Sequence, residues 1–235
     1  PHLYLCDPHR RALVGLSPQR MTRVSDLRVA LGLDWGSTSP GVVGWAAALP
    51  NGHVHFFDEW KFSRSIYGSI TARFVAEQMG ERTRAWGLPW PLLVYADSAI
   101  QADIGQIGES IGQTLTRHGC TRLVYPSKDR VAGWQRVHEA LAVDPATGTP
   151  WLTFHPRCRY LIRSLPLQVQ DAHNPEDVDT TGDDHGADMI RMVLMGGLRP
   201  QTGPRDPELP TGSVGWWRRW HERRAQGTGV LHAAR

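Results

Sequence analysis

The order of apolar segments along the chain is the feature that most restricts its fold. Three apolar or alternating runs cover residues 29–33, 41–49 and 53–62, and turn-forming residues separate them. The last two runs flank Asn51-Gly52, a dipeptide typical of a tight hairpin. The sequence therefore predicts that three consecutive antiparallel strands open the fold.

Helical and extended patterns alternate after residue 62. Apolar residues at helical spacing predict helices over 66–86, from Ile104 through Ile111 and Leu115 to Gly119, over 131–141, around 158–165 and over 184–195. Short apolar runs predict strands at 92–95, 123–125 and 151–154. This order fits an α/β fold of the ribonuclease H-like kind, a mixed sheet with helices on both faces.

Length and composition favour one folded domain with two flanking arms. With 235 residues, of which 40% are hydrophobic and 21% charged, the chain can bury a full core, which excludes a disordered chain, a fibre and a mini-protein. We expect a linker or the end of a preceding domain in residues 1–28, one domain in 29–198, and a basic Trp/Arg-rich tail in 199–235.

Several features bear on the setting of the chain. It begins with Pro1 rather than Met, which suggests a piece of a longer protein. No charged-then-apolar leader and no run of 18 apolar residues occurs, so secretion and membrane spanning lack support. The three widely spaced cysteines suit a reducing cytosol better than a disulfide framework; they are Cys6, Cys120 and Cys158.

The basic residues are concentrated in the tail. Residues 199–235 carry seven arginines, and the segment 215–224 combines Trp with Arg after a Pro/Gly-rich stretch. Arg pairs well with phosphate and Trp can stack on bases. The segment can therefore contact DNA or another protein, or fold back onto the domain, and the sequence leaves both open.

Acidic residues occur where such a sheet would bring them together. Asp34 closes the first strand and Asp97 the fourth, while Asp183, Asp184 and Asp188 lie at the last helix. Neighbouring strands that end at one sheet edge place such groups side by side. Carboxylates pushed together repel one another unless a divalent cation compensates them, and hard oxygen ligands select Mg²⁺ or Mn²⁺.

Each acid also has a structural explanation. An Asp after a strand often caps a turn or a helix, and Asp183-Asp184 can cap the last helix and complement its dipole. Asp188 resists this explanation, because it lies inside an otherwise apolar helix. The three regions together favour a metal site over a solvated surface.

Two further residues are candidates for the chemistry. Lys128 follows a predicted strand and can hold a phosphate or steady the carboxylates, or it is a solvated turn cation. His185 can move a proton or contact a metal-bound water, or it is a structural histidine. The sequence alone does not choose between these roles.

Four segments carry a resemblance to a known family. They are Gly32-Leu33-Asp34-Trp35-Gly36, then Ala96-Asp97-Ser98, then Lys128 with Gly133, and last the acidic stretch 176–188, which includes Asp183-Asp184-His185 and Asp188. Residues 29–198 resemble the C-terminal nuclease domain of the large terminase subunit of tailed bacteriophages. The resemblance implies a ribonuclease H-like fold, with Asp34, Asp97 and Asp188 matching catalytic acids and Asp183 and Asp184 matching acids that help to hold metal.

The resemblance also implies an activity and partners. It implies a divalent-metal-dependent DNA endonuclease, a hydrolase that cuts concatemeric double-stranded DNA during genome packaging, with two Mg²⁺ or Mn²⁺ ions activating water and stabilising the leaving group. Expected partners are DNA, the small terminase subunit and the portal protein. The family also has an N-terminal packaging ATPase, and we expect it upstream of this chain, because this chain has no G-x-x-x-x-G-K-S/T motif. The expected location is the cytoplasm of the infected bacterial host, with no membrane contact.

Other readings remain at this point. Residues 32–38 also resemble the first phosphate-binding hairpin of sugar kinases and actin-like ATPases, although those enzymes need a second such loop. A junction resolvase or transposase can carry the same acids. A packaging adaptor without catalytic activity would use its acids only to repel DNA or to dock a basic partner.

Overall fold

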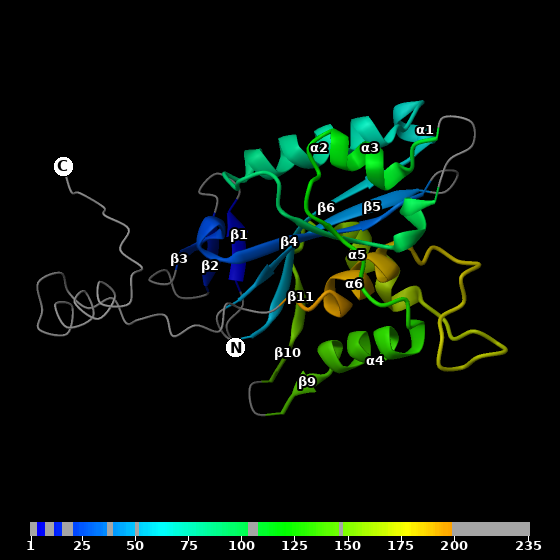
Figure 1. Cartoon of the computed structure of the whole chain (residues 1–235). Helices are drawn as coiled ribbons and strands as arrows, with labels where there is room; N and C mark the ends of the chain where they lie inside the picture. The colour runs from blue at the N-terminus through cyan, green and yellow to red at the C-terminus, as the bar shows by residue number, and fades with distance from the viewer. Residues whose placement is uncertain are drawn as a thin grey trace, which may run out of the picture. The chain divides into compact units, whose positions relative to one another are not determined.

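The structure of the chain, a computed structural model, describes most of residues 4–198 (Figure 1). The described ranges are 4–7, 12–15, 21–36, 40–49, 52–102, 108–145 and 148–198. The tail 199–235 lies outside them, so its predicted contacts with DNA or protein stay predictions.

A six-stranded mixed sheet forms the centre of the fold. Its strands lie in the order β11-β6-β5-β4-β7-β8. They are β4 (Arg28–Asp34), β5 (Gly41–Ala48), β6 (Val54–Phe62), β7 (Leu93–Ala96), β8 (Leu123–Val124) and β11 (Leu152–Phe154). β4, β5 and β6 are antiparallel, whereas β7 pairs parallel with β4 and with β8, and β11 pairs parallel with β6. The predicted strands and the mixed sheet are confirmed.

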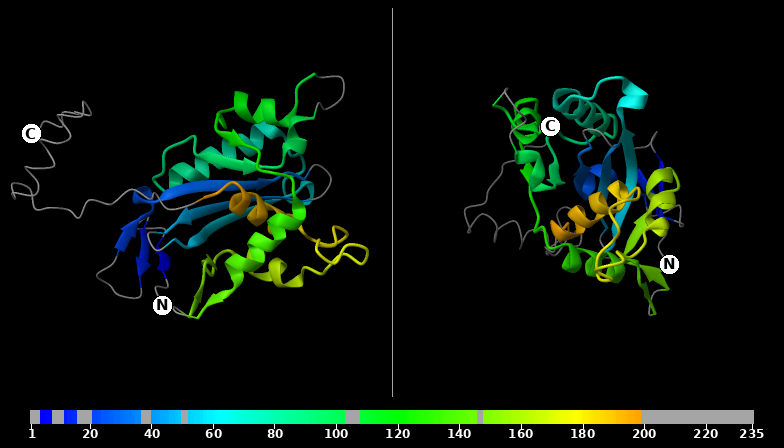
Figure 2. Two further views of the ribbon diagram at one scale, coloured as in Figure 1. Left: turned by 60° about the horizontal axis from the view of Figure 1, so that its bottom comes forward. Right: turned by 90° about the vertical axis from the view of Figure 1, so that its right-hand side faces the viewer.

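Helices cover both faces of this sheet. The α-helices are α1 (Arg64–Tyr67), α2 (Ala72–Ala85), α3 (Ile111–Arg117), α4 (Arg130–Leu141), α5 (Arg159–Ser164) and α6 (His185–Met195). Short 3₁₀ helices are η1 (Val24–Asp26), η2 (Ser98–Gln101) and η4 (Leu165–Leu167). α2 and α3 lie on one face and α4, α5 and α6 on the other (Figures 1 and 2). The expected ribonuclease H-like layering is therefore confirmed.

Two predicted helices differ from what their apolar spacing indicates. The helix expected over 66–86 is interrupted, because Gly68 takes a φ of +74° after α1 and Thr71 caps the start of α2 by accepting from Phe74 N. In the helix expected from Ile104, residues 103–107 lie outside the described part. α3 itself begins only at Ile111, because Ser110 and Gln113 form a capping box.

Two small sheets accompany the main one. β1 (Tyr4–Asp7), β2 (Ala12–Gly15) and β3 (Met21–Arg23) form an antiparallel sheet in the segment expected to be a linker or the end of a preceding domain. β9 (Val143–Asp144) and β10 (Thr149–Pro150) form the other. The sequence analysis predicted none of these strands, and the expected division of the chain into domains stays a prediction.

The alternation along β4 separates two hydrophobic cores. Val29, Leu31 and Leu33 belong to the core under α2 and α3, while Ala30 belongs to the core under α6. Side chains on a strand alternate between the two faces of its sheet, so even-numbered residues of β4 face α6. Asp34, which ends the strand, continues this even-numbered series.

Two paired glycines let α6 lie close to the sheet. Gly32 of β4 and Gly44 of β5 are partners in the ladder, and we call them the glycine notch. A Cβ atom at Gly32 would lie 2.5 Å from Met189 Sδ, and one at Gly44 would lie 2.5 Å from Met189 Cε. Met189 belongs to α6, so a larger residue in the notch would force the side chain of Met189, or the helix itself, to move.

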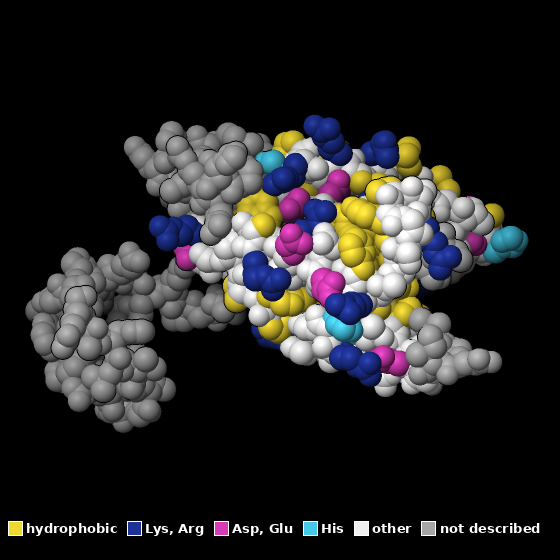
Figure 3. Space-filling model, turned by 90° about the horizontal axis from the view of Figure 1, so that it is seen from above, with side chains coloured by type: hydrophobic (Ala, Val, Ile, Leu, Met, Phe, Trp, Pro, Cys, Tyr) yellow, Lys and Arg dark blue, Asp and Glu magenta, His cyan; other side chains and the backbone are white. Residues whose placement is uncertain are grey.

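The surface carries mixed charge on the face that α2 and α3 cover. Figure 3 shows Lys and Arg side chains there interspersed with Asp and Glu. Within the described ranges, no helix is long and apolar enough to cross a membrane. Cys120 and Cys158 are buried, and Cys158 Sγ donates to the carbonyl of Phe56 at 3.5 Å.

Candidate active site

Two strand-end aspartates lie side by side at the centre of the sheet. Leu33 of β4 pairs with Ala96 of the parallel strand β7, so Asp34 and Asp97 are adjacent at the same sheet edge. Asp97 also caps η2 by accepting a hydrogen bond of 2.7 Å from Ala99 N. The cap that the sequence offered as an alternative for Asp97 is thus present, and it leaves this residue next to Asp34.

The start of α6 brings a histidine onto Asp34. His185 Nδ1 lies 2.8 Å from Asp34 Oδ2, and each side chain is about one-fifth exposed, 19% and 20%. Asp184 occupies the N-cap position but makes no side-chain capping bond, and its carbonyl accepts from Asp188 N at 2.8 Å. Asp184 and Asp188 are therefore one helical turn apart beside the strand-end acids.

Burial and mutual repulsion raise the pKa values of two of these acids. Burial raises the pKa of Asp34, the hydrogen bond with His185 opposes this, and the charges of Asp188 and Asp97 raise the pKa further. Burial together with the charges of Asp188 and Asp34 raises the pKa of Asp184 to about 6. The four acids Asp34, Asp97, Asp184 and Asp188 thus form one electrostatic group, and we call them the acid group.

His185 responds in the opposite sense. Its hydrogen bond with Asp34 raises the pKa of the imidazole, against the effect of burial. Because a raised histidine pKa favours the charged ring, the contact is an ion pair over a wider pH range than for a free histidine. The protonated His185 ring is therefore a cation next to Asp34 and can give up a proton there.

Asp183 makes its contacts outside the acid group. It accepts a hydrogen bond from the Tyr160 hydroxyl and pairs with Lys61 Nζ at 3.0 Å. Burial opposes the effect, but these two partners lower the pKa of Asp183. Lys61 also stands over the Tyr160 ring, 4.0 Å from its centroid. The predicted metal role of Asp183 stays a prediction, and these contacts favour a supporting role.

Lys128 lies at the acid group, as expected for either of its functional roles. Its Nζ is 3.4 Å from Asp97 Oδ1, and its side chain is 61% exposed. A pair this open contributes little to stability, because water screens it. Lys128 is therefore free to contact a substrate as well as Asp97.

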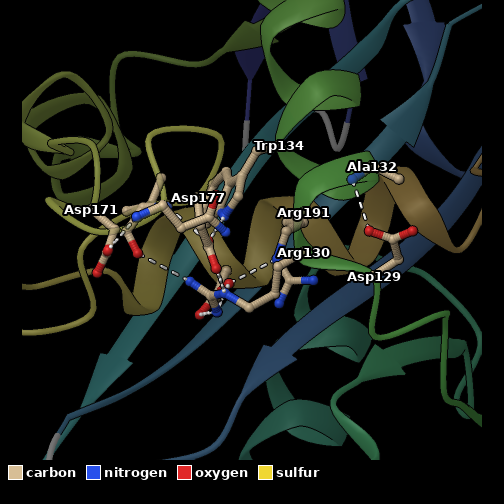
Figure 4. Close-up of polar contacts among 10 residues, drawn as sticks. Asp129, Arg130, Ala132, Trp134, Asp171, Asp177 and Arg191 are labelled. Carbon is tan, nitrogen blue, oxygen red and sulfur yellow. Dashed lines mark hydrogen bonds and ion pairs between the residues drawn. The ribbon is translucent and has the colours of Figure 1, made fainter.

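The other side of the acid group holds two arginines that the sequence analysis did not single out. Arg191 Nε donates to Asp188 Oδ1 at 2.8 Å, and Arg130 Nη1 lies 3.3 Å from Asp188 Oδ2. Figure 4 shows Arg130 reaching from α4 toward Asp177, with Arg191 of α6 beside it. The three-residue spacing of Asp188 and Arg191 on one helix is a signal that could have been used. Nothing local in the sequence marks Arg130.

The acid group fits a hard divalent cation in its chemistry. It offers carboxylate oxygens, and burial together with neighbouring charges raises the pKa values of two of its members, Asp34 and Asp184; a bound cation would relieve this repulsion. Among the described residues, no three His, Cys, Asp or Glu side chains are grouped as ligands of one metal ion. Both oxygens of Asp188 accept hydrogen bonds from arginines here.

Comparisons with known proteins bear on the fold. No protein-family model and no curated protein matches the sequence. Among solved structures, the P22 large terminase nuclease domain matches at a TM-score of 0.55 and 14% identity, over 75% of this chain and 84% of that domain. The large terminase nuclease from thermophilic phage G20c with bound cobalt matches at a TM-score of 0.50 and 14% identity, over 81% and 90%.

A longer protein matches as well. A large terminase from a thermophilic bacteriophage, in complex with ADP, matches at a TM-score of 0.55 and 15% identity over 71% of this chain. This chain covers 39% of that protein, about two-fifths of its length. The chain therefore has the ribonuclease H-like fold of large terminase nuclease domains.

Proposed function

We propose that this domain is a divalent-metal-dependent endonuclease that cuts concatemeric double-stranded DNA during phage genome packaging. The observation that carries the proposal is the acid group: two aspartates at neighbouring strand ends and two on α6, with His185 bonded to Asp34. The fold shared with terminase nuclease domains supports it.

The acid group is the proposed metal site. Mg²⁺ or Mn²⁺, as two ions, fits its oxygen donors, and the phage G20c nuclease was solved with bound cobalt. Asp34, Asp97, Asp184 and Asp188 would hold the ions. When bound, such ions supply water activation and neutralise the charge of the phosphate.

The residues around the acid group have separate tasks in this proposal. His185 holds a proton at Nδ1 against Asp34 Oδ2 and keeps this carboxylate oriented. Lys128, exposed beside Asp97, contacts a DNA phosphate. Lys61 and Tyr160 fix Asp183 at the start of α6.

The same proposal extends to the partners. DNA is the substrate, and an ATPase domain would precede this domain in the full-length protein, because the chain covers two-fifths of a terminase solved with ADP. The small terminase subunit and the portal protein are proposed as partners, and the host cytoplasm as the place of action.

A plasmid-cleavage assay tests this proposal. The purified 235-residue chain is incubated with supercoiled plasmid in Mn²⁺ or Mg²⁺, with and without EDTA. We expect cleavage by the wild type that EDTA abolishes. Asp97→Asn and Asp188→Asn should lose at least about 100-fold in rate, since they remove proposed ligands rather than their outer partners.

Asp179→Asn is the matched control. It makes the same charge change in the same acidic stretch, and Asp179 accepts its hydrogen bond from Thr181 N, outside the acid group. This variant should cut like the wild type. Cleavage that persists in EDTA, or at full rate in Asp97→Asn and Asp188→Asn, would refute the proposal.

A further inference from the structure

Asp188 is held unevenly by its two arginine partners. Arg191 Nε donates to Oδ1 at 2.8 Å, and its side chain is only 3% exposed. Arg130 Nη1 lies 3.3 Å from Oδ2 and 3.4 Å from Oδ1, and its side chain is 28% exposed. One oxygen of Asp188 is thus fixed from inside the protein, and the other has a longer contact at the open side.

Arg130 has its main partner elsewhere. Its Nε donates to both oxygens of Asp177, at 2.9 and 3.0 Å, and Trp134 Nε1 donates to the same carboxylate at 2.8 Å. Figure 4 shows this arrangement between α4 and the acidic stretch. Arg130 therefore can release Asp188 and keep its bifurcated hydrogen bond with Asp177.

Arg191 has no second carboxylate partner in the described part of the chain, and its guanidinium lies over the Trp134 ring, 5.6 Å from the centroid. Its Nη1 is buried without a hydrogen-bond partner. Its stem is confined by α4, since a Cβ atom at Gly133 would lie 2.7 Å from both Arg191 Cγ and Cδ. Burying a guanidinium with an unpaired N–H opposes stability, and groups that oppose stability are typical of functional sites.

We propose that Arg191 is the positioning residue for Asp188. It holds Oδ1, so that a cation can replace the longer contact of Arg130 at Oδ2. This inference rests on the proposed function, because it assigns the outer partner of a proposed metal ligand. Partners of this kind orient ligating carboxylates, and their loss commonly lowers metal affinity or activity by about 10–100-fold.

Mn²⁺ binding, measured by calorimetry on the 235-residue chain, tests the inference without cleavage. Arg191→Gln should weaken Mn²⁺ binding about tenfold or more. Arg191→Lys should recover part of that loss, because it restores the charge but not the planar fork. The cleavage assay should show a lower kcat with an unchanged KM for plasmid.

A second variant keeps the test informative if Arg191→Gln does not fold. Gly133→Ala retains every charge and displaces the stem of Arg191, so it should also weaken Mn²⁺ binding. Arg136→Gln, an exposed arginine on the same helix as Gly133, is the control and should leave Mn²⁺ binding unchanged.

The outcomes separate this inference from the proposed function. If the wild type binds no Mn²⁺, the proposed metal site fails, and the inference fails with it. If the wild type binds Mn²⁺ and folded Arg191→Lys and Gly133→Ala bind it equally well, only the role of Arg191 is overturned. Tighter Mn²⁺ binding in these variants would also overturn it, because it would make Arg191 a competitor of the cation.

Discussion

The two faces of the central sheet are built differently. The face under α2 and α3 buries large side chains, among them Trp45, Phe57 and Met79, none of which is exposed. The face under α6 has the glycine notch, where the helix approaches the strands closely, and it ends at the acid group. The face under α6 also buries large side chains, such as Phe56 and Tyr95. The comparison indicates that both faces stabilise the fold and that the face under α6 places the charged groups as well.

Removing the carboxylate of Asp34 should give the largest loss of cleavage, with little loss of stability. Asp34→Asn should lower the cleavage rate at least about 100-fold. It should cost no more than about 1 kcal/mol in the free energy of unfolding, because burial penalises the charge that it removes. Plasmid cleavage and urea unfolding measure the two quantities.

Leu115→Ala is the counterpart on the opposite face. Leu115 of α3 is fully buried, so its truncation should lower the free energy of unfolding by about 2–5 kcal/mol. Cleavage should persist at temperatures where the variant stays folded. A variant of either kind that lost both properties equally would break the comparison.

A larger residue in the glycine notch should lower both the stability of the fold and the cleavage rate. Gly32→Ala places a methyl group 2.5 Å from Met189 Sδ and 2.7 Å from Val193 Cγ2, so it should cost about 1–3 kcal/mol and reduce cleavage by moving α6. Urea unfolding and the plasmid assay check this. Gly182→Ala, with no atom within 4 Å of the added Cβ, is the control for stability.

The pH dependence of stability should show the raised pKa of Asp184. The folded pKa of about 6 lies above the ordinary 3.8, so ionisation between about pH 4 and 6 destabilises the folded state. In EDTA, the wild type should lose stability relative to Asp184→Asn as the pH rises through this range. Urea unfolding at several pH values measures the difference, and parallel curves would contradict it.

Breaking the ion pair between Asp183 and Lys61 should have the smallest effect on stability and cleavage. Asp183 and Lys61 have side chains that are 49% and 28% exposed, and such pairs contribute about 0–1 kcal/mol. Asp183→Asn should therefore change stability and cleavage only slightly. A loss of cleavage as large as that of Asp34→Asn would instead place Asp183 among the metal ligands.

The sequence predicts well what depends on local pattern. Alternating residues placed β4, β5 and β6, and the Asp at the end of β4 followed from that assignment. Helix starts were predicted less well, because capping by Thr71 and Ser110 decides them more than apolar spacing does. The pattern of residues 1–28 indicated no strands, although three short ones form there.

The contacts of the site depend on long-range packing. Arg130 and Asp177 are 47 residues apart in sequence, and their contact depends on how the segment that holds Asp177 lies against α4. The same holds for Lys61 and Asp183, which are 122 residues apart. Contacts between residues so far apart produce no periodic pattern in a single sequence. The acids could therefore be predicted, whereas most of their cationic partners could not.

Three groups of the site lie on one helix and therefore move together. They are His185, Asp188 and Arg191. These three groups belong to α6, whose distance from the sheet the glycine notch sets. Lifting that helix would separate all of them from Asp34 in a single motion, because a helix moves as a rigid body. A displacement of α6 would therefore break the contact of His185 with Asp34 and move Asp188 and Arg191 at the same time.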